Sequence, residues 1–217
     1  MEILWETKSL IAVVKPPHLV SEQVGDGSGL GDLLAEKNGG YIGVIHRMDR
    51  GVGGVTVYAK TKNAAAKLSE EVREHRLEKV YLAVVEGCPE TLEGEWKDLL
   101  YYDRQRNKVF PVQRQRNGVK EAILQYRVLK TAVDPKTEKT VSLVEVTPLT
   151  GRTHQIRVQF ASRGMPLFGD GKYGSRKKGC RTALFASALV GEGLSVSLMP
   201  PREEYPWNLF EKEVYEA

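Results

Sequence analysis

The sequence predicts an α+β protein with a long, mostly antiparallel sheet and a few short flanking helices. Short β-branched and aromatic runs recur along the chain, helical stretches are few, and glycine or proline closes most segments. The 217 residues are 41% apolar and 28% charged, a balance that argues against disorder, collagen and coiled coil. A chain of this length can bury a sizeable core, and we expect one domain over residues 1–217.

Strands and helices alternate in the first half of the sequence. An apolar run at residues 10–14 ends at Pro16-Pro17 and predicts a buried strand, and further strands are expected at 42–45, 55–59 and 79–85. A short helix is expected at 30–36, where Asn38-Gly39-Gly40 stops it. A second helix is expected at 63–76, where Asn63 can cap the first turn.

The second half is richer in strands. Residues 121–133 and 140–146 predict a hairpin around the turn Asp134-Pro135. Residues 154–162 have helical character and end before a Gly-Met-Pro stop. A last strand pair is expected at 183–189 and 194–198, and the tail 207–215 can close with one or two helical turns.

Cysteine usage and the amino terminus indicate the compartment. Cys88 and Cys180 are isolated and no CxxC or Cys/His cluster exists, which argues against a zinc site and fits a reducing cytosol. Glu2 and Glu6 stand where a signal peptide would carry positive charge, and no apolar run approaches the ~20 residues of a membrane span. We expect a soluble, cytoplasmic protein without a membrane partner.

The first segment that can carry chemistry is residues 46–54, His-Arg-Met-Asp-Arg-Gly-Val-Gly-Gly. Asp49 lies between Arg47 and Arg50 in a loop that glycines allow to approach a ligand closely. Arginine beside aspartate can lower the carboxyl pKa by about 1–3 units, which would keep a nucleophile ionised. The alternative is a turn aspartate that bonds its own backbone, with both arginines in solvent.

The second segment, residues 149–157, runs from a turn into an expected helix start. Free N–H groups of a first helical turn can bind an anion, and Arg152 and Arg157 add guanidiniums that suit phosphate or carboxylate. Thr153 can cap the helix and His154 can bond locally. An ordinary basic helix start with a structural histidine is the alternative.

Two further segments are less specific. Residues 164–174 hold four glycines in eleven positions, which indicates a loop of special dihedral angles that supports a site. Tyr81 stands near the start of an expected strand, where it can be a half-buried packing residue or can stack on a nucleobase.

In this order, the segments resemble the RluA-type family of RNA pseudouridine synthases, and the resemblance covers nearly the whole chain. No single motif is decisive, whereas the ordered set is highly specific. The matching segments are Lys15-Pro16-Pro17, His46-Arg47-Met48-Asp49, Lys79-Val80-Tyr81, residues 150–157 from Thr150 to Arg157, and residues 169–174.

The resemblance implies a pseudouridine synthase catalytic domain with a mixed, mainly antiparallel sheet and a central cleft, which isomerises uridine in rRNA or tRNA. It implies that Asp49 is the catalytic aspartate, that Tyr81 packs on the target base and can assist proton removal, and that Arg157 pairs with the aspartate. Arg47 would enter the space left by a flipped nucleotide. Attack at the ribose C1′ and proton abstraction at C2′ both remain open.

The other basic and polar residues of the two motifs are expected to contact the RNA. They are His46, Arg50, Arg152, His154 and Gln155. The reaction involves no redox change and the chain has no phosphate-binding glycine fingerprint, so we expect no metal and no cofactor.

Two segments depart from the family's pattern, in which Thr-Ser-Gly commonly follows the catalytic loop and a histidine often occupies position 159. Here Val52-Gly53-Gly54 and Gln159 stand instead, and we expect activity to survive. The chain starts almost at the catalytic domain, so we also expect no N-terminal RNA-binding domain and a monomeric enzyme.

The formal net charge of +4 conceals an uneven distribution. Residues 101–120 carry a net +5 and residues 151–182 a net +7, whereas the last seventeen residues carry −3. Two basic runs, one of which contains the matched motif, indicate a positively charged RNA-binding rim. The alternatives are a catalytically silent RNA-binding or ribosome-assembly protein of the same fold, and a glycoside hydrolase, for which Asp49 has no convincing second acid.

Overall fold

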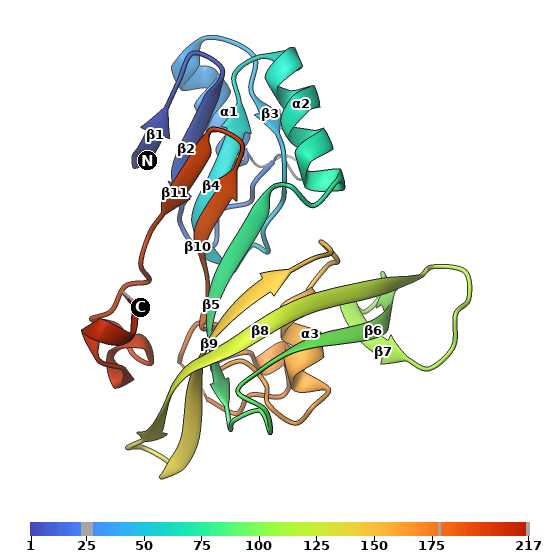
Figure 1. Ribbon diagram of the computed structural model, residues 1–217, viewed down its shortest axis with the longest axis vertical. Coiled ribbons are helices and arrows are strands. Elements are labelled where there is room, and N and C mark those ends of the chain that lie inside the picture. Colours follow the sequence, from blue (N-terminus) through green and yellow to red (C-terminus); the bar gives the residue numbers. More distant parts are fainter. Residues whose placement is uncertain (23–27, 178, 216–217) are drawn as a thin grey trace. The chain divides into compact units, whose positions relative to one another are not determined.

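The computed structural model describes residues 1–22, 28–177 and 179–215, and contacts within it divide the chain into two compact units (Figure 1). The first unit comprises residues 1–79 and 185–198, and the second comprises residues 80–184 and 199–217. Eleven strands and three α-helices occupy the described residues, and mixed but mainly antiparallel pairing confirms the α+β prediction. The single domain and the central cleft stay predictions.

Within its described residues, the first unit contains six strands of the sheet. Its strands are β1 (Ile3–Glu6), β2 (Leu10–Lys15), β3 (Gly43–Val44), β4 (Gly53–Ala59), β10 (Leu184–Gly191) and β11 (Leu194–Ser197). The order is β1-β2-β4-β10, with β3 paired to β4 and β11 to β10. The β4–β10 pair is parallel, whereas the other pairs are antiparallel. The antiparallel pairing of β10 with β11 confirms the expected last strand pair.

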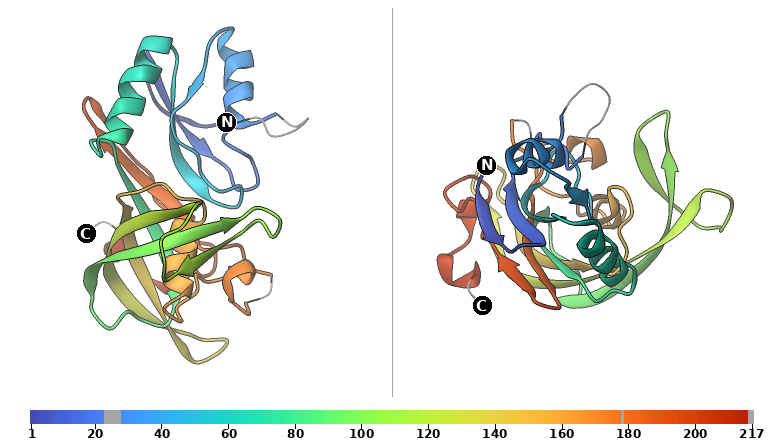
Figure 2. Two further views of the ribbon diagram at one scale, coloured as in Figure 1. Left: turned by 90° about the vertical axis from the view of Figure 1, so that its right-hand side faces the viewer. Right: turned by 90° about the horizontal axis from the view of Figure 1, so that it is seen from above.

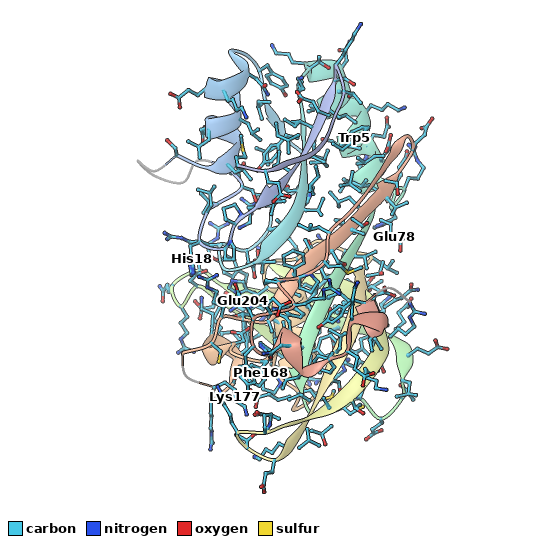
Figure 3. The ribbon with its side chains drawn as sticks, turned by 90° about the vertical axis from the view of Figure 1, so that its left-hand side faces the viewer. Trp5, His18, Glu78, Phe168, Lys177 and Glu204 are labelled. Atoms are coloured by element: carbon cyan, nitrogen blue, oxygen red, sulfur yellow. The ribbon has the colours of Figure 1, made fainter. Side chains whose placement is uncertain are left out.

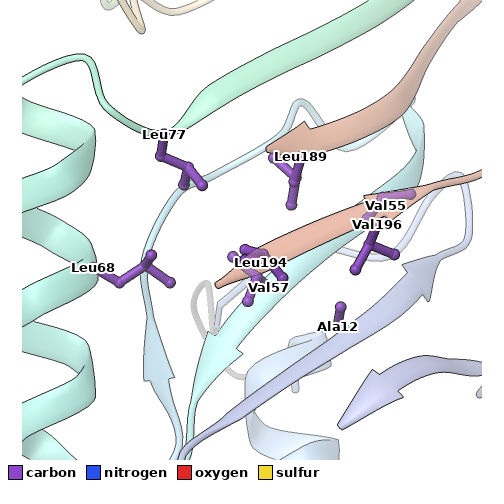
Figure 4. Packing of buried hydrophobic residues seen from close by; sticks show 8 residues of the cluster. All are labelled: Ala12, Val55, Val57, Leu68, Leu77, Leu189, Leu194 and Val196. Carbon is purple, nitrogen blue, oxygen red and sulfur yellow. The ribbon is translucent and has the colours of Figure 1, made fainter. Parts of the chain in front are cut away.

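Both faces of this sheet are covered, which explains why every residue of β4 is buried. On β2, Ala12 belongs to a cluster with Leu68 of α2 (Lys62–Arg73), as Figure 4 shows. The alternate residue Ile11 packs with Leu34 of α1 (Leu30–Asn38) instead. The strand period of two therefore sends neighbouring residues to opposite faces, and the two helices lie on opposite sides of the strands (Figure 2).

The start of α2 differs from the prediction. Thr61, in extended conformation, accepts a hydrogen bond from Ala64 N at 3.2 Å and is the N-cap, so the expected cap Asn63 lies inside the helix. The helix also ends at Arg73 and not at residue 76. Threonine and asparagine are both favourable N-caps, each for the N–H two or three residues further on, and local composition does not distinguish the two registers.

The second unit holds five strands in the order β5-β9-β8-β6-β7. They are β5 (Glu78–Glu86), β6 (Glu93–Asp103), β7 (Lys108–Val112), β8 (Val119–Asp134) and β9 (Lys139–Pro148). The β8–β9 hairpin confirms the expected turn at Asp134-Pro135. The β6–β7 hairpin was not predicted, because its charged and exposed residues hide the strand pattern.

One short helix, α3 (Gln155–Ala161), packs against this sheet near β6 and β7 (Figure 1). Val158 contacts a cluster that includes Leu100 and Val109, and the Phe160 ring lies edge-on to Trp96 with centroids 4.7 Å apart. Buried apolar side chains therefore hold α3 by one face. Beyond it lie the 3₁₀ turns η1 (Gly171–Tyr173), η2 (Trp207–Leu209) and η3 (Lys212–Tyr215).

A buried carboxylate joins three segments of the second unit. Asp134 is fully buried and accepts hydrogen bonds from Lys177 Nζ, from Thr137 Oγ1 at 2.6 Å and from Tyr205 Oη at 2.6 Å. Burial alone would raise the pKa of Asp134, but these donors outweigh burial and the pKa lies below its usual value. Lys177 also lies over the ring of Phe168, and Figure 3 labels both. The network ties the C-terminal segment to the β8–β9 turn.

Gly54 gives a test of the packing in the first unit. Its φ is +122°, and a Cβ there would lie 2.2 Å from the carbonyl oxygen of Ala186. We predict that Gly54→Ala lowers the free energy of unfolding by more than about 1 kcal/mol, because the substitution both strains the backbone and separates β4 from β10.

The matched control is Gly51→Ala, whose Cβ would meet nothing within 4 Å. Its unfolding free energy should stay within about 0.5 kcal/mol of the original protein. Urea denaturation followed by circular dichroism measures both, and equal values for the two variants would contradict the close contact.

Candidate active site

Asp49 lies half-buried in the loop that connects β3 to β4. The loop is fixed by its backbone: Val52 N donates to Asp49 O at 3.0 Å, and Met48 N donates to the Ser21 hydroxyl at 3.2 Å. The residue after Asp49 is tied as well, since His18 N donates to Arg50 O at 2.6 Å. Bonds on both sides therefore fix the backbone from which the Asp49 side chain projects.

Lys15, at the end of β2, is the buried cation beneath this loop. Its side chain is fully buried, and its ammonium donates to Leu19 O at 2.6 Å, to Pro16 O at 3.2 Å and to Arg50 O at 3.5 Å. Burial lowers the pKa of Lys15 to about 8, and the negative charge of Asp49 opposes part of that shift. The lysine thus holds the loop by its carbonyls and acts electrostatically on the candidate nucleophile.

The two arginines beside Asp49 have other partners. Arg47 is exposed, and its Nη1 forms an ion pair with Glu22 at 3.0 Å. Arg50 donates from Nε to His18 O at 3.0 Å. Among the described residues, Arg47 is held by this solvent-exposed ion pair, which is worth about 0–1 kcal/mol and is readily exchanged for a phosphate.

His46 has a structural environment. It is 9% exposed, its Nε2 lies 3.5 Å from Thr56 Oγ1, and its Nδ1 is buried without a hydrogen-bond partner in the described part of the chain. Burial and then the nearby Lys79 cation lower the pKa of His46 to about 4. The imidazole is consequently neutral at physiological pH, and its contact with RNA stays a prediction.

Tyr81 and Arg157 lie in the second unit. Tyr81 is half-buried on β5, opposite Val146 of β9. Arg157 projects from α3 and forms two hydrogen bonds with Asp170, Nε to Oδ2 at 2.6 Å and Nη2 to Oδ1 at 2.8 Å. Their side chains are 13% and 1% exposed, so this is a buried, bidentate ion pair.

The remaining residues of the basic motif are held in the same unit. Gln155 is buried: its Oε1 accepts from Thr150 Oγ1 at 2.7 Å and from Arg152 N at 3.0 Å, and its Nε2 donates to Ile123 O at 2.9 Å. Arg152 is exposed and donates from Nε to Glu121 O. The Gln155 amide thus builds the turn before α3, and its contact with RNA stays a prediction.

His154 stands at the first position before α3 in a left-handed conformation, with φ +52°. Its Nδ1 lies 2.8 Å from the hydroxyl of Tyr173, whose ring faces the Arg157 guanidinium at 5.1 Å. The helix has seven residues, and the backbone N–H of Val158 bonds within it to His154 O at 3.0 Å. The anion that the structure places here is the Asp170 carboxylate, which Arg157 binds, and anion binding by the first turn of α3 stays a prediction.

The structure thus distributes the predicted residues between the two units. His46, Arg47, Asp49 and Arg50 lie together in the first unit, whereas Tyr81, Arg152, His154, Gln155 and Arg157 lie in the second. A site that joins Asp49 to Tyr81 and Arg157 stays a prediction.

Sequence reasoning missed Lys15, Asp170 and Tyr173 as members of the site. Lys15 lies in the Lys15-Pro16-Pro17 segment, and Asp170 and Tyr173 lie in the glycine-rich segment 164–174, so the sequence had marked both segments. Only the tertiary contacts show which residues these three side chains support.

Two absences concern the described residues alone. Among residues 1–22, 28–177 and 179–215, no group of three or more His, Cys, Asp and Glu side chains could hold a metal ion. None of the helices in that part of the chain is long and apolar enough to cross a membrane.

Known proteins resemble this chain in sequence and in fold. Residues 9–162 match the RNA pseudouridylate synthase family. Ribosomal large subunit pseudouridine synthase C of Buchnera aphidicola is 34% identical over 182 residues, and synthase D of Zymomonas mobilis is 32% identical over 205 residues. These alignments cover 81% and 89% of this chain but only 54% and 62% of the relatives, so the chain spans little more than half of their length.

A solved structure agrees on the fold. Human RNA Pseudouridylate Synthase Domain Containing 1 superimposes with a TM-score of 0.77 at 23% identity, over 95% of this chain and 85% of that one. The chain belongs to the RNA pseudouridylate synthase family, whose members are isomerases that act on RNA.

The coupling between Asp49 and Lys15 gives a direct prediction. Because the Asp49 charge raises the Lys15 pKa against the effect of burial, Asp49→Asn should lower that pKa below its value of about 8. A titration of the lysine side-chain resonances by NMR measures the shift. Glu22→Gln, which removes another carboxylate of the same unit, is the control and should leave the Lys15 value unchanged. A Lys15 pKa that stays at about 8 in Asp49→Asn would contradict the coupling.

Proposed function

We propose that this chain isomerises specific uridines of rRNA or tRNA to pseudouridine, with Asp49 as the nucleophile. The observation that carries the proposal is the family match over residues 9–162, which contains Asp49, Tyr81 and Arg157 in the expected order. The fixed backbone around Asp49 supports it, because a nucleophile must be held in a near-attack geometry. Tyr81 would pack on the target base, and Arg157 would pair with Asp49.

The reaction conserves every atom of the nucleotide. The bond from ribose C1′ to uracil N1 breaks, the base turns, and C5 bonds to C1′; C5 loses a proton and N1 gains one. A carboxylate can form a covalent intermediate with such a sugar centre. The uridine must first leave its stack, which costs a few kcal/mol, and Arg47, whose ion pair with Glu22 is exposed, is the residue that would fill the space.

Exposed cations of the second unit support RNA as the partner. The turn between β6 and β7 and the loop after β7 carry Arg104, Arg106, Arg114 and Arg116, all exposed. Arg104 and Arg114 have no acidic partner in the described part of the chain, and Arg116 lies over the ring of Tyr101 at 5.0 Å. Unpaired guanidiniums on one hairpin suit a phosphate backbone. Lys178, part of the second basic run, lies outside the described residues.

The nucleophile can be tested with a substrate RNA and a pseudouridine assay. Asp49→Asn and Asp49→Ala should reduce product formation by about 10³-fold or more, because neither side chain can serve as the proposed carboxylate nucleophile. RNA binding should persist, since the phosphate contacts remain. Gel-shift binding with the same RNA is the control, and turnover retained in Asp49→Ala would overturn the assignment.

If the original protein binds RNA but converts no uridine in any RNA tested, the catalytically silent reading replaces this one. Pseudouridine mapping of total RNA, with and without the gene, identifies the target. A position that loses its modification in the deletion strain supports the enzyme.

The charged hairpin predicts a salt dependence. The affinity for RNA should fall steeply with salt, and the double variant Arg104→Ala/Arg114→Ala should flatten the plot of log K against log[salt] by about 1 per lost phosphate contact. The matched control is Arg127→Ala, because Arg127 already pairs with Glu145 at 3.1 Å in the same unit. A salt slope equal in the double variant and the original protein would show that RNA does not use this hairpin.

A further inference from the structure

We propose that Asp170 is a positioning residue that aims the Arg157 guanidinium, and that the loop from Gly169 to Gly174 exists to hold it. This inference rests on the proposed function, in which Arg157 acts on Asp49. The two hydrogen bonds from Nε and Nη2 to the two carboxylate oxygens fix the plane and the direction of the guanidinium. Because they hold the edge formed by Nε and Nη2, they also set the direction in which the opposite edge of the guanidinium points.

The backbone around Asp170 is itself fixed. Asp170 O accepts hydrogen bonds from Tyr173 N at 3.1 Å and from Ser175 N at 3.1 Å, and Gly169 N donates to the Ser175 hydroxyl at 3.0 Å. Gly169 has a φ of +77°, and a Cβ there would lie 2.3 Å from Arg181 O. Only glycine therefore fits at this position, and the turn that follows places the carboxylate at one point in the unit.

Tyr173 completes the support from a second side. Its ring lies 5.1 Å from the Arg157 guanidinium carbon, and its hydroxyl accepts from Val109 N at 2.9 Å and lies 2.8 Å from His154 Nδ1. An aromatic face attracts a cation held against it. The guanidinium is thus bound along one edge by a carboxylate and lies over the face of the Tyr173 ring, which is anchored to β7.

Stability alone does not explain this arrangement. Two charges removed from water recover little net free energy from their pairing, and an apolar pair of similar volume would often serve as well. A second bidentate pair nearby, Arg163 with Asp98, joins the residues after α3 to β6 without contacting any predicted site residue. Both pairs are bidentate, although Arg163 binds through its two Nη atoms and Arg157 binds through Nε and Nη2. Asp98 is therefore the control for the loss of a bidentate carboxylate elsewhere in the same unit.

The test compares Asp170→Asn with Asp98→Asn in the full chain. In Asp170→Asn an amide N–H replaces one acceptor, so the guanidinium turns; kcat should fall by about 10- to 100-fold, the scale of a ~1 Å misplacement, with KM unchanged. Asp98→Asn should keep kcat within about twofold. Circular dichroism melts establish that both variants are folded at the assay temperature.

A cycle with Arg157→Lys separates positioning from general damage. Lysine keeps the charge but cannot form the bidentate pair. If Asp170 acts only through Arg157, the double variant Asp170→Asn/Arg157→Lys should lose no more kcat than Arg157→Lys alone. Independent, multiplicative losses would overturn the proposal, as would a full kcat in folded Asp170→Asn.

Two alternative experiments cover a variant that does not fold and a protein that forms no pseudouridine. Should Asp170→Asn not fold, Asp170→Glu replaces it; the longer side chain keeps the charge but shifts the contact, and a kcat equal to that of the original protein would overturn the proposal. Should the original protein form no pseudouridine, the proposed function fails, and NMR decides the positioning separately. The Arg157 Nε–H should be protected from exchange in the original protein and lose that protection in Asp170→Asn, and unchanged protection would overturn the role of Asp170.

Discussion

A cation that leaves water needs protein oxygens in place of its hydration shell, and this constraint organises both halves of the candidate site. In the first unit, the fully buried ammonium of Lys15 is surrounded by backbone carbonyls of the two loops that flank Asp49. In the second, the guanidinium of Arg157 is bound by the carboxylate of Asp170. Each cation forces nearby chain segments to converge, because an unsatisfied buried charge is far costlier than an ordered loop. The need to surround Lys15 and Arg157 with oxygen atoms therefore helps to fix the conformations of the loops that contact them.

The choice of ligand gives the two cations different properties. Carbonyl oxygens leave the positive charge of Lys15 uncompensated, and burial therefore lowers its pKa to about 8 while the Asp49 charge acts against that shift. The carboxylate of Asp170 compensates the charge of Arg157 and fixes its plane, and a guanidinium does not lose its proton in either case. The Lys15 charge thus acts electrostatically on Asp49, the candidate nucleophile, whereas Asp170 fixes the direction of the Arg157 guanidinium.

Local sequence patterns were sufficient for most of the fold. The apolar run of β2 and the β8–β9 hairpin follow from alternation and turn chemistry, which act over a few residues. The β6–β7 hairpin was missed because exposed charged residues obscure its alternation. The pairing of Arg157 with Asp170 was missed for a different reason: the two residues are thirteen positions apart, across a glycine-rich loop. No periodicity encodes such a pair, which only tertiary structure brings into contact.

The two departures from the family's pattern can be understood in the same physical terms. Val52 is 3% exposed, and its backbone N–H closes the turn at Asp49, so its contribution to the loop comes through the backbone and through packing, not through a hydroxyl. Gln159 is fully buried on α3, and its amide donates to Asp98 Oδ2 at 2.7 Å, within the Arg163–Asp98 pair. A histidine there could donate the same hydrogen bond through a ring N–H. Both substitutions therefore alter the support of the loop and of the helix, and they leave the predicted reacting groups in place.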